Sequence, residues 1–356
     1  MKLTKTLTRT YHASLTAALS CFWLLASSAA HAQSSTAALE EFYRGKTIQM
    51  LIGYPAGGTY DLYARVISRH LGKHVPGNPH VVPQNMPGAG TLNATSHVYS
   101  VAPQNGTVIT ATASSMPFQP MFQKIGVPFD AAKAHWLPVP AGFTALMIVW
   151  HKSPVKSFDD LRKRETIMGT ISPGSTPHFV AVVLNNVLGS KIKPITGHPN
   201  MNSNLLAMER GELEGYTTVP PSAIERTYKH QWEAKQYLPI LQIGTKKNPG
   251  LEHIPLARDL AANVADRMMI DMAAAPLTLG YPYMMGPGVP PERVKAMRDA
   301  FMLVFADPAF VAEAKKATLE IEPMTGEQVQ KFIQDAYNAP QDVRDRLKAI
   351  FDSQFK

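Results

Sequence analysis

Residues 48–65 read IQMLIGYPAGGTYDLYAR and join an apolar run, a glycine turn and the start of a helical pattern. The apolar run at 48–52 predicts a short buried strand. The turn AGGT at 56–59 follows it, and Asp61 stands where helical periodicity begins. We therefore expect a strand, a tight loop and a helix in this order.

The helix that follows this turn is suited to an anion. Glycine lets the backbone fold closely around a bound group. The first helical turn has unpaired N–H groups and the positive end of the helix dipole, which together favour a carboxylate or a phosphate. The alternative is an ordinary surface turn, with Asp61 as a first-turn acid of a surface helix.

Residues 1–32 have the pattern of a secretory signal peptide. Three basic residues come before an apolar stretch at 13–30, and a small-x-small site ends at Ala32. A membrane anchor agrees less well, because the stretch contains Ser and Thr and no second hydrophobic span follows. We expect cleavage after Ala32 and export to the periplasm.

The composition is that of an ordinary globular protein, and 356 residues suggest two domains. Cys21, the only cysteine, lies in the leader, so the mature chain has no disulfide and no cysteine metal site. The residues before Cys21 make a poor lipobox. Removal of the leader lowers the formal net charge from +8 to about +5. The basic residues are scattered, so we expect no nucleic-acid partner.

Further strand–loop–helix units follow. A strand is expected at 80–82 before the loop NMPGAG at 85–90, then a helix at 91–101 and a strand at 108–113. This alternation predicts βαβ units around a parallel sheet, with ligands outside the carboxyl ends of the strands. Neither glycine loop has a complete GxGxxG or a GK[ST], which excludes dinucleotide and P-loop sites.

The second half of the chain repeats this design. A strand at 167–171 leads into SPGSTPH at 172–178 and a helix through about Leu188. Small hydroxylated residues and glycine at a helix N-terminus again suit an anion. Ser175 and His178 raise the alternative of an exported hydrolase. However, their spacing alone does not make a nucleophile–base pair, and no GxSxG elbow is present.

Other elements are read from periodicity and turn residues. Strands are expected at 146–150, 192–196, near 218 and at 238–243. One helix is expected to begin at 157, another to end at 210, and a short one to lie within 220–232. Three more helices are expected at 290–305, 308–317 and 326–351. The Met-rich run at 268–272 is interpreted as core filling. His70 and His74 could share a helical face, but with no third ligand we expect two surface histidines rather than a zinc site.

Five motifs in sequence order resemble one family, the Bug or TctC-type periplasmic solute-binding proteins of tripartite tricarboxylate transporters. They are PAGGTYD at 55–61, NMPGAG at 85–90, SPGSTPH at 172–178, GELE at 211–214 and the aromatic, Pro- and Gly-containing stretch at 281–291. Ala56, Met86 and Thr91 depart from the family pattern, and these departures concern the ligand rather than the fold.

The resemblance implies a two-domain α/β periplasmic-binding-protein fold, a Venus flytrap of type II-like form with a ligand cleft between the domains. Domain 1 would comprise 40–144 plus 280–356, and domain 2 would comprise 145–279. It also implies a monomeric protein that captures a small organic carboxylate for membrane permease subunits, with no catalysis, cofactor or metal. A ligand-binding component of a membrane sensor is an alternative with the same closure.

The resemblance further implies that the first loop holds a carboxylate through backbone N–H groups and water. Asp61 would orient that water or an amine, and the second-domain loop would grip the opposite end of the ligand. Tyr54 and Tyr60 could stack on a ligand ring or pack at the cleft edge. The expected ligand-binding residues are Tyr54, Ala56, Gly57, Gly58, Thr59, Tyr60, Asp61, Ser115, Ser172, Gly174, Ser175, Thr176, His178, Gly197 and His198.

Overall fold

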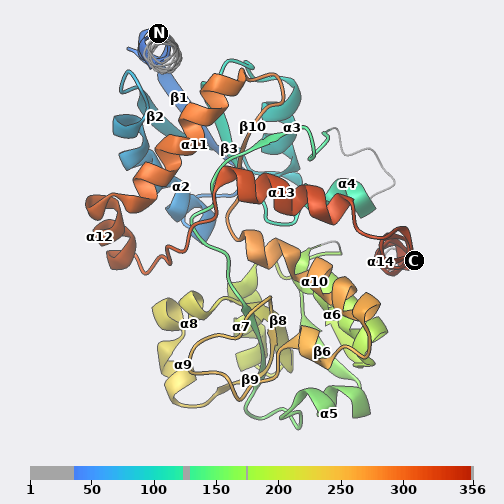
Figure 1. Cartoon of the computed structure of the whole chain (residues 1–356). Coiled ribbons are helices and arrows are strands. Elements are labelled where there is room, and N and C mark those ends of the chain that lie inside the picture. Colours follow the sequence, from blue (N-terminus) through green and yellow to red (C-terminus); the bar gives the residue numbers. More distant parts are fainter. Residues whose placement is uncertain (1–35, 123–128, 174, 354–356) are drawn as a thin grey trace, which may run out of the picture.

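The computed structural model describes residues 36–122, 129–173 and 175–353 and contains two five-stranded sheets flanked by helices (Figure 1). The predicted leader, its cleavage site and Gly174 lie outside the described residues. The elements around each sheet are called the first lobe and the second lobe. No helix of the described segments is long and apolar enough to span a membrane.

The first sheet has the order β2-β1-β3-β10-β4. Its strands are β1 (Thr47–Ile52), β2 (His80–Asn85), β3 (Val108–Ala111), β4 (His135–Trp136) and β10 (Tyr283–Met285). The second sheet has the order β7-β6-β8-β5-β9. Its strands are β5 (Ala145–Trp150), β6 (Thr166–Gly169), β7 (Ile192–Ile195), β8 (Gly215–Val219) and β9 (Tyr237–Ile243).

Both sheets are mixed: each has three adjacent parallel strands, as the βαβ alternation predicted, together with antiparallel pairs that it did not predict. β1 runs parallel to β2 and β3, but β10 runs antiparallel to β3 and to β4. In the second sheet β5 is antiparallel to β8 and to β9. The reason is the path of the chain. A strand that enters a lobe from the other lobe starts at the side where the parallel strands end, and therefore runs against them.

The first lobe is covered by amphipathic helices. Along α2, for example, Tyr63, Val66, Ile67 and Leu71 recur at helical spacing and are buried. The helices drawn with this lobe are α2 (Thr59–Leu71), α3 (Leu92–Ser100), α4 (Gln119–Phe122), α11 (Pro291–Ala306), α12 (Pro308–Lys316) and α13 (Gly326–Tyr337).

The second lobe contains one helix that the sequence interpretation missed. The Met-rich run at 268–272 belongs to α10 (Val264–Leu279), which has Pro276 inside it and packs on α6. The run does fill the core, since Met269 and Ile270 are buried. The other helices are α5 (Phe158–Lys163), α6 (Thr176–Leu188), α7 (Met201–Glu209), α8 (Pro221–Thr227) and α9 (Lys229–Glu233).

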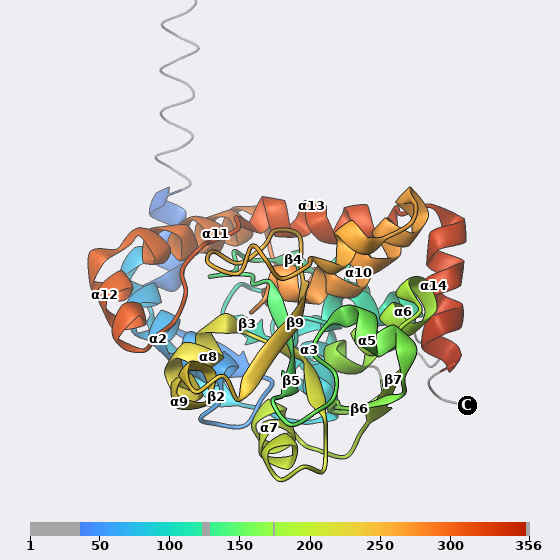
Figure 2. The same ribbon diagram turned by 90° about the horizontal axis from the view of Figure 1, so that it is seen from below.

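The single helix expected at 326–351 is two helices, α13 and α14 (Gln341–Ser353). Pro340 explains the break, because the residue before a proline is disfavoured in helical conformation. Figures 1 and 2 show α14 turned away from α13 and lying beside α6. The ring of Phe351 lies 5.7 Å from that of Phe179, so the C-terminal helix packs on the second lobe.

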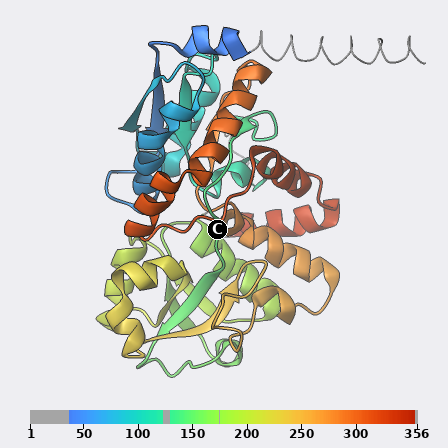
Figure 3. The same cartoon turned by 60° about the vertical axis from the view of Figure 1, so that its left-hand side comes forward.

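The chain passes between the lobes at two adjacent segments, 137–144 and 280–282 (Figure 3). Phe143 N–H donates to Leu277 O at 3.0 Å, which ties the first passage to the end of α10, just before the second passage. Gly280 has a φ of +59°, and a Cβ there would lie 1.9 Å from Ala141 O. Only glycine fits this close approach without displacing the backbone.

Candidate ligand-binding site

The glycine loop follows the carboxyl end of β1 and leads into α2 as expected. α2 begins at Thr59, and its N-cap residue Gly58 gives it no side-chain cap bond. Gly57 has a φ of +92°, a conformation that residues with a Cβ rarely adopt. The first turn of α2 therefore presents backbone N–H groups without the side-chain oxygen that usually occupies a helix start.

The Asp61 carboxylate connects this loop to Asn85 and Arg65 through hydrogen bonds. Its Oδ2 accepts from Gly57 N–H at 2.9 Å, its Oδ1 accepts from Asn85 Nδ2 at 2.8 Å, and Arg65 Nε donates to both oxygens at 2.9 Å. Burial raises the pKa of this carboxyl, but the hydrogen bonds from Arg65, Gly57 and Asn85 outweigh burial and bring the pKa below its usual value. Asp61 is 4% exposed, so it acts first as the anchor of the loop.

Tyr54 and Tyr60 pack on each other, with ring centroids 4.4 Å apart. Tyr60 also donates to Gly280 O at 2.9 Å and accepts from Ser114 N–H at 3.2 Å. Burial raises the pKa of Tyr60. Tyr60 thus packs on Tyr54 and is held by two hydrogen bonds with other segments. Its hydroxyl joins the ligand loop to the passage between the lobes.

The loop of the second lobe is built from hydroxyl groups. Ser175 Oγ donates to Ser172 O at 2.6 Å and accepts from Ser172 N–H at 3.3 Å. α6 begins at Thr176, and its N-cap residue Ser175 makes no side-chain cap bond. In contrast, the start of α7 carries a capping box between Asn200 and Ser203. Like α2, α6 therefore starts without a side-chain cap.

His178 is buried below this loop, 6% exposed, with Nδ1 3.1 Å from Thr170 Oγ1. Burial lowers the pKa of His178, which favours a neutral imidazole. No hydrogen bond joins His178 to Ser175 in the described part of the chain. The nucleophile–base pair that the alternative hydrolase requires is therefore not formed.

The remaining predicted site residues flank these loops. Ser115 begins a 3₁₀ turn after β3, and its carbonyl accepts from Phe118 N–H at 3.0 Å. Gly197 N–H donates to Ile171 O at 3.3 Å, which ties the segment containing His198 to the hydroxyl loop. Ala56, at the tip of the first loop, is exposed.

Two residues at the site were missed by sequence reasoning. Asn85 was noted only as part of a motif, yet its amide binds Asp61 and also donates to Tyr54 O at 2.9 Å. Arg226 of α8 donates from Nη2 to Thr59 Oγ1 at 3.0 Å, from the second lobe to the first. Asn85 could have been inferred from its place at the end of β2. No local signal identifies Arg226, because it is 167 residues from its partner.

His70, on α2, and His74, on the 3₁₀ turn that follows it (Gly72–His74), were expected to be surface histidines, but both are partly buried and contact carboxylates. His70 Nε2 lies 2.7 Å from Glu313 Oε2, and His74 Nε2 lies 3.1 Å from Asp307 Oδ2. Both carboxylates belong to the α12 segment, so the pair joins α2 to α12. The described residues contain no group of three or more ligands that could hold a metal ion.

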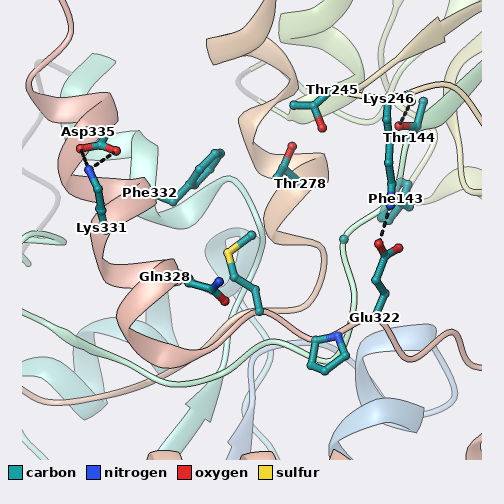
Figure 4. A pocket seen from close by; sticks show the side chains of 13 residues that line it. Phe143, Thr144, Thr245, Lys246, Thr278, Glu322, Gln328, Lys331, Phe332 and Asp335 are labelled. Carbon is teal, nitrogen blue, oxygen red and sulfur yellow. Dashed lines mark hydrogen bonds and ion pairs between the residues drawn. The ribbon is translucent and has the colours of Figure 1, made fainter.

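A pocket of 510 Å³ lies beside the passages between the lobes, between α13 and α10 (Figure 4). Phe332 and Thr278 face it, and the Lys331–Asp335 ion pair, with Nζ to Oδ1 at 2.8 Å, lies at one edge. A second pocket of 810 Å³ lies between the passages and α8–α9. The predicted ligand-binding residues line neither of these two pockets.

Two curated proteins are similar in sequence. A UPF0065 protein encoded in the gbd 5′ region of Cupriavidus necator is 24% identical over 85% of this chain and 88% of its own length. A UPF0065 protein of Bordetella bronchiseptica is 26% identical over 45% of this chain and 49% of its own length. No protein-family model matches the chain.

Solved structures match over most of the chain. A TctC solute-binding protein from Polaromonas has a TM-score of 0.65 at 18% identity, covering 87% of this chain and 99% of its own. The periplasmic binding protein BugD has a TM-score of 0.64 at 15% identity, covering 88% and 98%.

Two further structural neighbours were solved with ligands. An R. palustris protein with adipate has a TM-score of 0.62 at 18% identity, covering 85% of this chain and 97% of its own. MatC from Rhodopseudomonas palustris with bound malate has a TM-score of 0.63 at 13% identity, covering 84% and 99%. The resemblance inferred from the five motifs is thereby confirmed: over most of its length the chain has the two-domain α/β fold of TctC- and Bug-type periplasmic solute-binding proteins.

Proposed function

We propose that this protein is an extracytoplasmic solute-binding protein that captures a small organic carboxylate between its two lobes. The observation that carries the proposal is the pair of helix starts, α2 and α6, which belong to different lobes and have no side-chain cap. Backbone N–H groups at such starts bind carboxylates without needing a cation. The dicarboxylates bound by two structural neighbours, adipate and malate, support this ligand class.

We propose the same ligand-binding residues as expected from the sequence, on both sides of the cleft. The domain boundaries are likewise proposed as 40–144 plus 280–356 and 145–279. The C-terminal helix α14 contacts α6 and α10 of the second lobe and α4 of the first, so it bridges the two lobes.

We propose that the partner is the membrane permease of a tripartite tricarboxylate-type transporter and that the mature, monomeric protein acts in the periplasm after cleavage behind Ala32. If the protein instead served a membrane sensor, it would use the same ligand site and the same closure of the lobes. Deletion of the permease genes distinguishes the two, since only the transport role predicts loss of carboxylate uptake.

The site is tested by placing bulk on the ligand loop. We expect Gly57→Val to weaken adipate and malate binding at least tenfold, since a Cβ at φ +92° distorts the loop that presents the N–H groups. The measurement is thermal shift of the mature protein from Gln33 onward. A ligand at a hundredfold excess over its Kd stabilises the folded state by about 2.7 kcal/mol.

Gly45→Val is the matched control. Gly45 also has a positive φ, +70°, and open space around it, but it precedes the amino end of β1. This variant should lose similar stability and retain binding. Equal binding by both variants, or a parallel loss of binding in both, would contradict a ligand site at the glycine loop.

A further inference from the structure

Arg226 reaches from one lobe to the ligand loop of the other. It lies near the end of α8, and Figures 1 and 2 show α8 at the edge of the second lobe next to α2. Its Nη2 donates to Thr59 Oγ1, at the first residue of α2, at 3.0 Å. A guanidinium therefore stands beside the uncapped helix start that we propose as the carboxylate site.

Two other basic or imidazole groups described at the loops, Arg65 and His178, do not supply a free positive charge. Arg65 is paired with Asp61 at 2.9 Å and also donates from Nη2 to Asn85 Oδ1 at 2.7 Å. His178 favours its neutral form because burial lowers its pKa. The loop sequences 53–61 and 172–178 contain no Lys or Arg.

Arg226 differs from Arg65 because its charge is not paired. Within the described segments it forms no ion pair, and its hydrogen bond goes to a neutral hydroxyl. This exposed guanidinium can therefore exchange its neutral acceptor for an anion.

We propose that Arg226 is a specificity-determining residue of the proposed site, which exchanges the Thr59 hydroxyl for a ligand carboxylate. This inference rests on the proposed function. A carboxylate is a stronger acceptor for a guanidinium than a hydroxyl, because the hydrogen bond then joins two charges. The planar fork of arginine can also bind both carboxylate oxygens, which lysine cannot do.

The position of Arg226 also links ligand charge to closure. The loop that presents the N–H groups belongs to the first lobe, whereas Arg226 belongs to the second. A carboxylate held by both is bound only when the lobes are together, so it favours the closed arrangement. A neutral amide of the same shape has one acceptor oxygen and no charge, so it would bind the guanidinium and the helix start less strongly and would stabilise closure less.

The test is calorimetric titration of the mature protein and its Arg226→Gln variant with adipate, malate and the neutral analogue adipamide. We expect Arg226→Gln to weaken adipate and malate binding by roughly 10- to 100-fold, the range for loss of a hydrogen bond to a charged group. The variant should also lose most of the preference for adipate over adipamide. Arg226→Lys should give an intermediate loss, since it keeps the charge without the fork.

Arg210→Gln is the matched control. Arg210 is an exposed cation of the same lobe, at the end of α7, and its removal changes the net charge equally. We expect it to keep wild-type affinity. The slope of adipate affinity against salt concentration should fall in Arg226→Gln and not in Arg210→Gln, because screening acts on the pair that is lost.

The outcomes separate the inference from the proposed function. Adipate or malate binding by the wild type with unchanged affinity and salt dependence in Arg226→Gln would overturn the role of Arg226 and leave the carboxylate site intact. An equal loss in Arg210→Gln would also overturn it, because a general charge effect would then suffice. If the wild type binds neither adipate nor malate, the proposed function fails and the inference fails with it.

Discussion

The loops that begin α2 and α6 occupy corresponding places in the two lobes, but different chemistry holds them. The first loop is fixed by a charged network in which Asp61 accepts from Gly57, Asn85 and Arg65. The second loop is fixed by neutral groups, with Ser175 bonded to Ser172 and His178 beside Thr170. Hydrogen bonds to charged groups are roughly twice as strong as neutral ones, so we expect the first loop to be the stiffer of the two.

This difference suggests a division of roles. A loop held rigidly in its binding conformation loses little freedom when a ligand binds, so the first lobe can supply most of the affinity for a carboxylate. A loop held by neutral hydroxyls can adapt to what lies at the other end of the ligand. The second lobe would then set the preference for the remainder of the ligand.

The largest expected effect comes from removal of the charged anchor. Asp61→Ala leaves the Gly57 N–H, the Asn85 amide and the Arg65 charge without their shared acceptor. We expect a loss of about 3 kcal/mol in the free energy of unfolding, with loss of carboxylate binding. Urea titration measures the first effect and calorimetry with adipate the second.

The matching change in the second lobe is Thr170→Val, which removes the hydroxyl beside His178. Its expected cost is about 1 kcal/mol, typical of a neutral hydrogen bond, with binding weakened but retained. Asp159→Ala, at an acid that is 71% exposed in the first turn of α5 and paired with Arg162, controls for loss of a surface carboxylate and its ion pair. A Thr170→Val cost equal to that of Asp61→Ala would remove the proposed difference in stiffness.

A smaller expected effect is that the two loops contribute to the stability of the protein with different pH dependence. The pKa of Asp61 is lowered in the folded state. Asp61 therefore stabilises the folded protein above the usual carboxyl pKa, and this contribution is lost as the pH falls through the pKa of Asp61 in the folded state. The pKa of His178 is also lowered, from 6.5. Below pH 6.5 the unfolded imidazole takes up a proton before the folded one, so stability falls as the pH drops.

The second loop should therefore weaken at mildly acidic pH while the first loop does not. His178→Gln tests this, since the variant should lose part of the fall in unfolding free energy between pH 7.5 and pH 5.5. The difference between wild type and variant isolates His178 from the other histidines. An identical fall in both proteins would show that His178 does not contribute.

Local signals predicted the framework of both loops. The bounds expected for α2 and α6 agree with the structure at Leu71 and Leu188, because apolar periodicity and the flanking Gly72 and Gly189 mark where each helix stops. Ser157 was identified as a helix start, and its capping box with Asp160 is present.

Two of the features that were missed depend on residues far apart in sequence, and a third, α10, was missed for a local reason. Strand direction in the mixed sheets follows from the passages between the lobes, which no window of sequence contains. The Arg226–Thr59 contact arises because α8 and α2 meet across the lobes. The helix α10 was not predicted because it contains Pro276 and a run of small residues, and a proline inside a helical pattern usually marks the end of the helix.

The measurement that tests the central claim most directly is NMR titration of the isotope-labelled mature protein with adipate, following the backbone amides. Binding between the two loops predicts the largest shifts at Gly58, Thr59 and Tyr60 and, in the same titration, at Thr176 and its neighbours. Shifts confined to one lobe, or centred on the pocket around Phe332 and Thr278, would contradict a carboxylate held between the two helix starts.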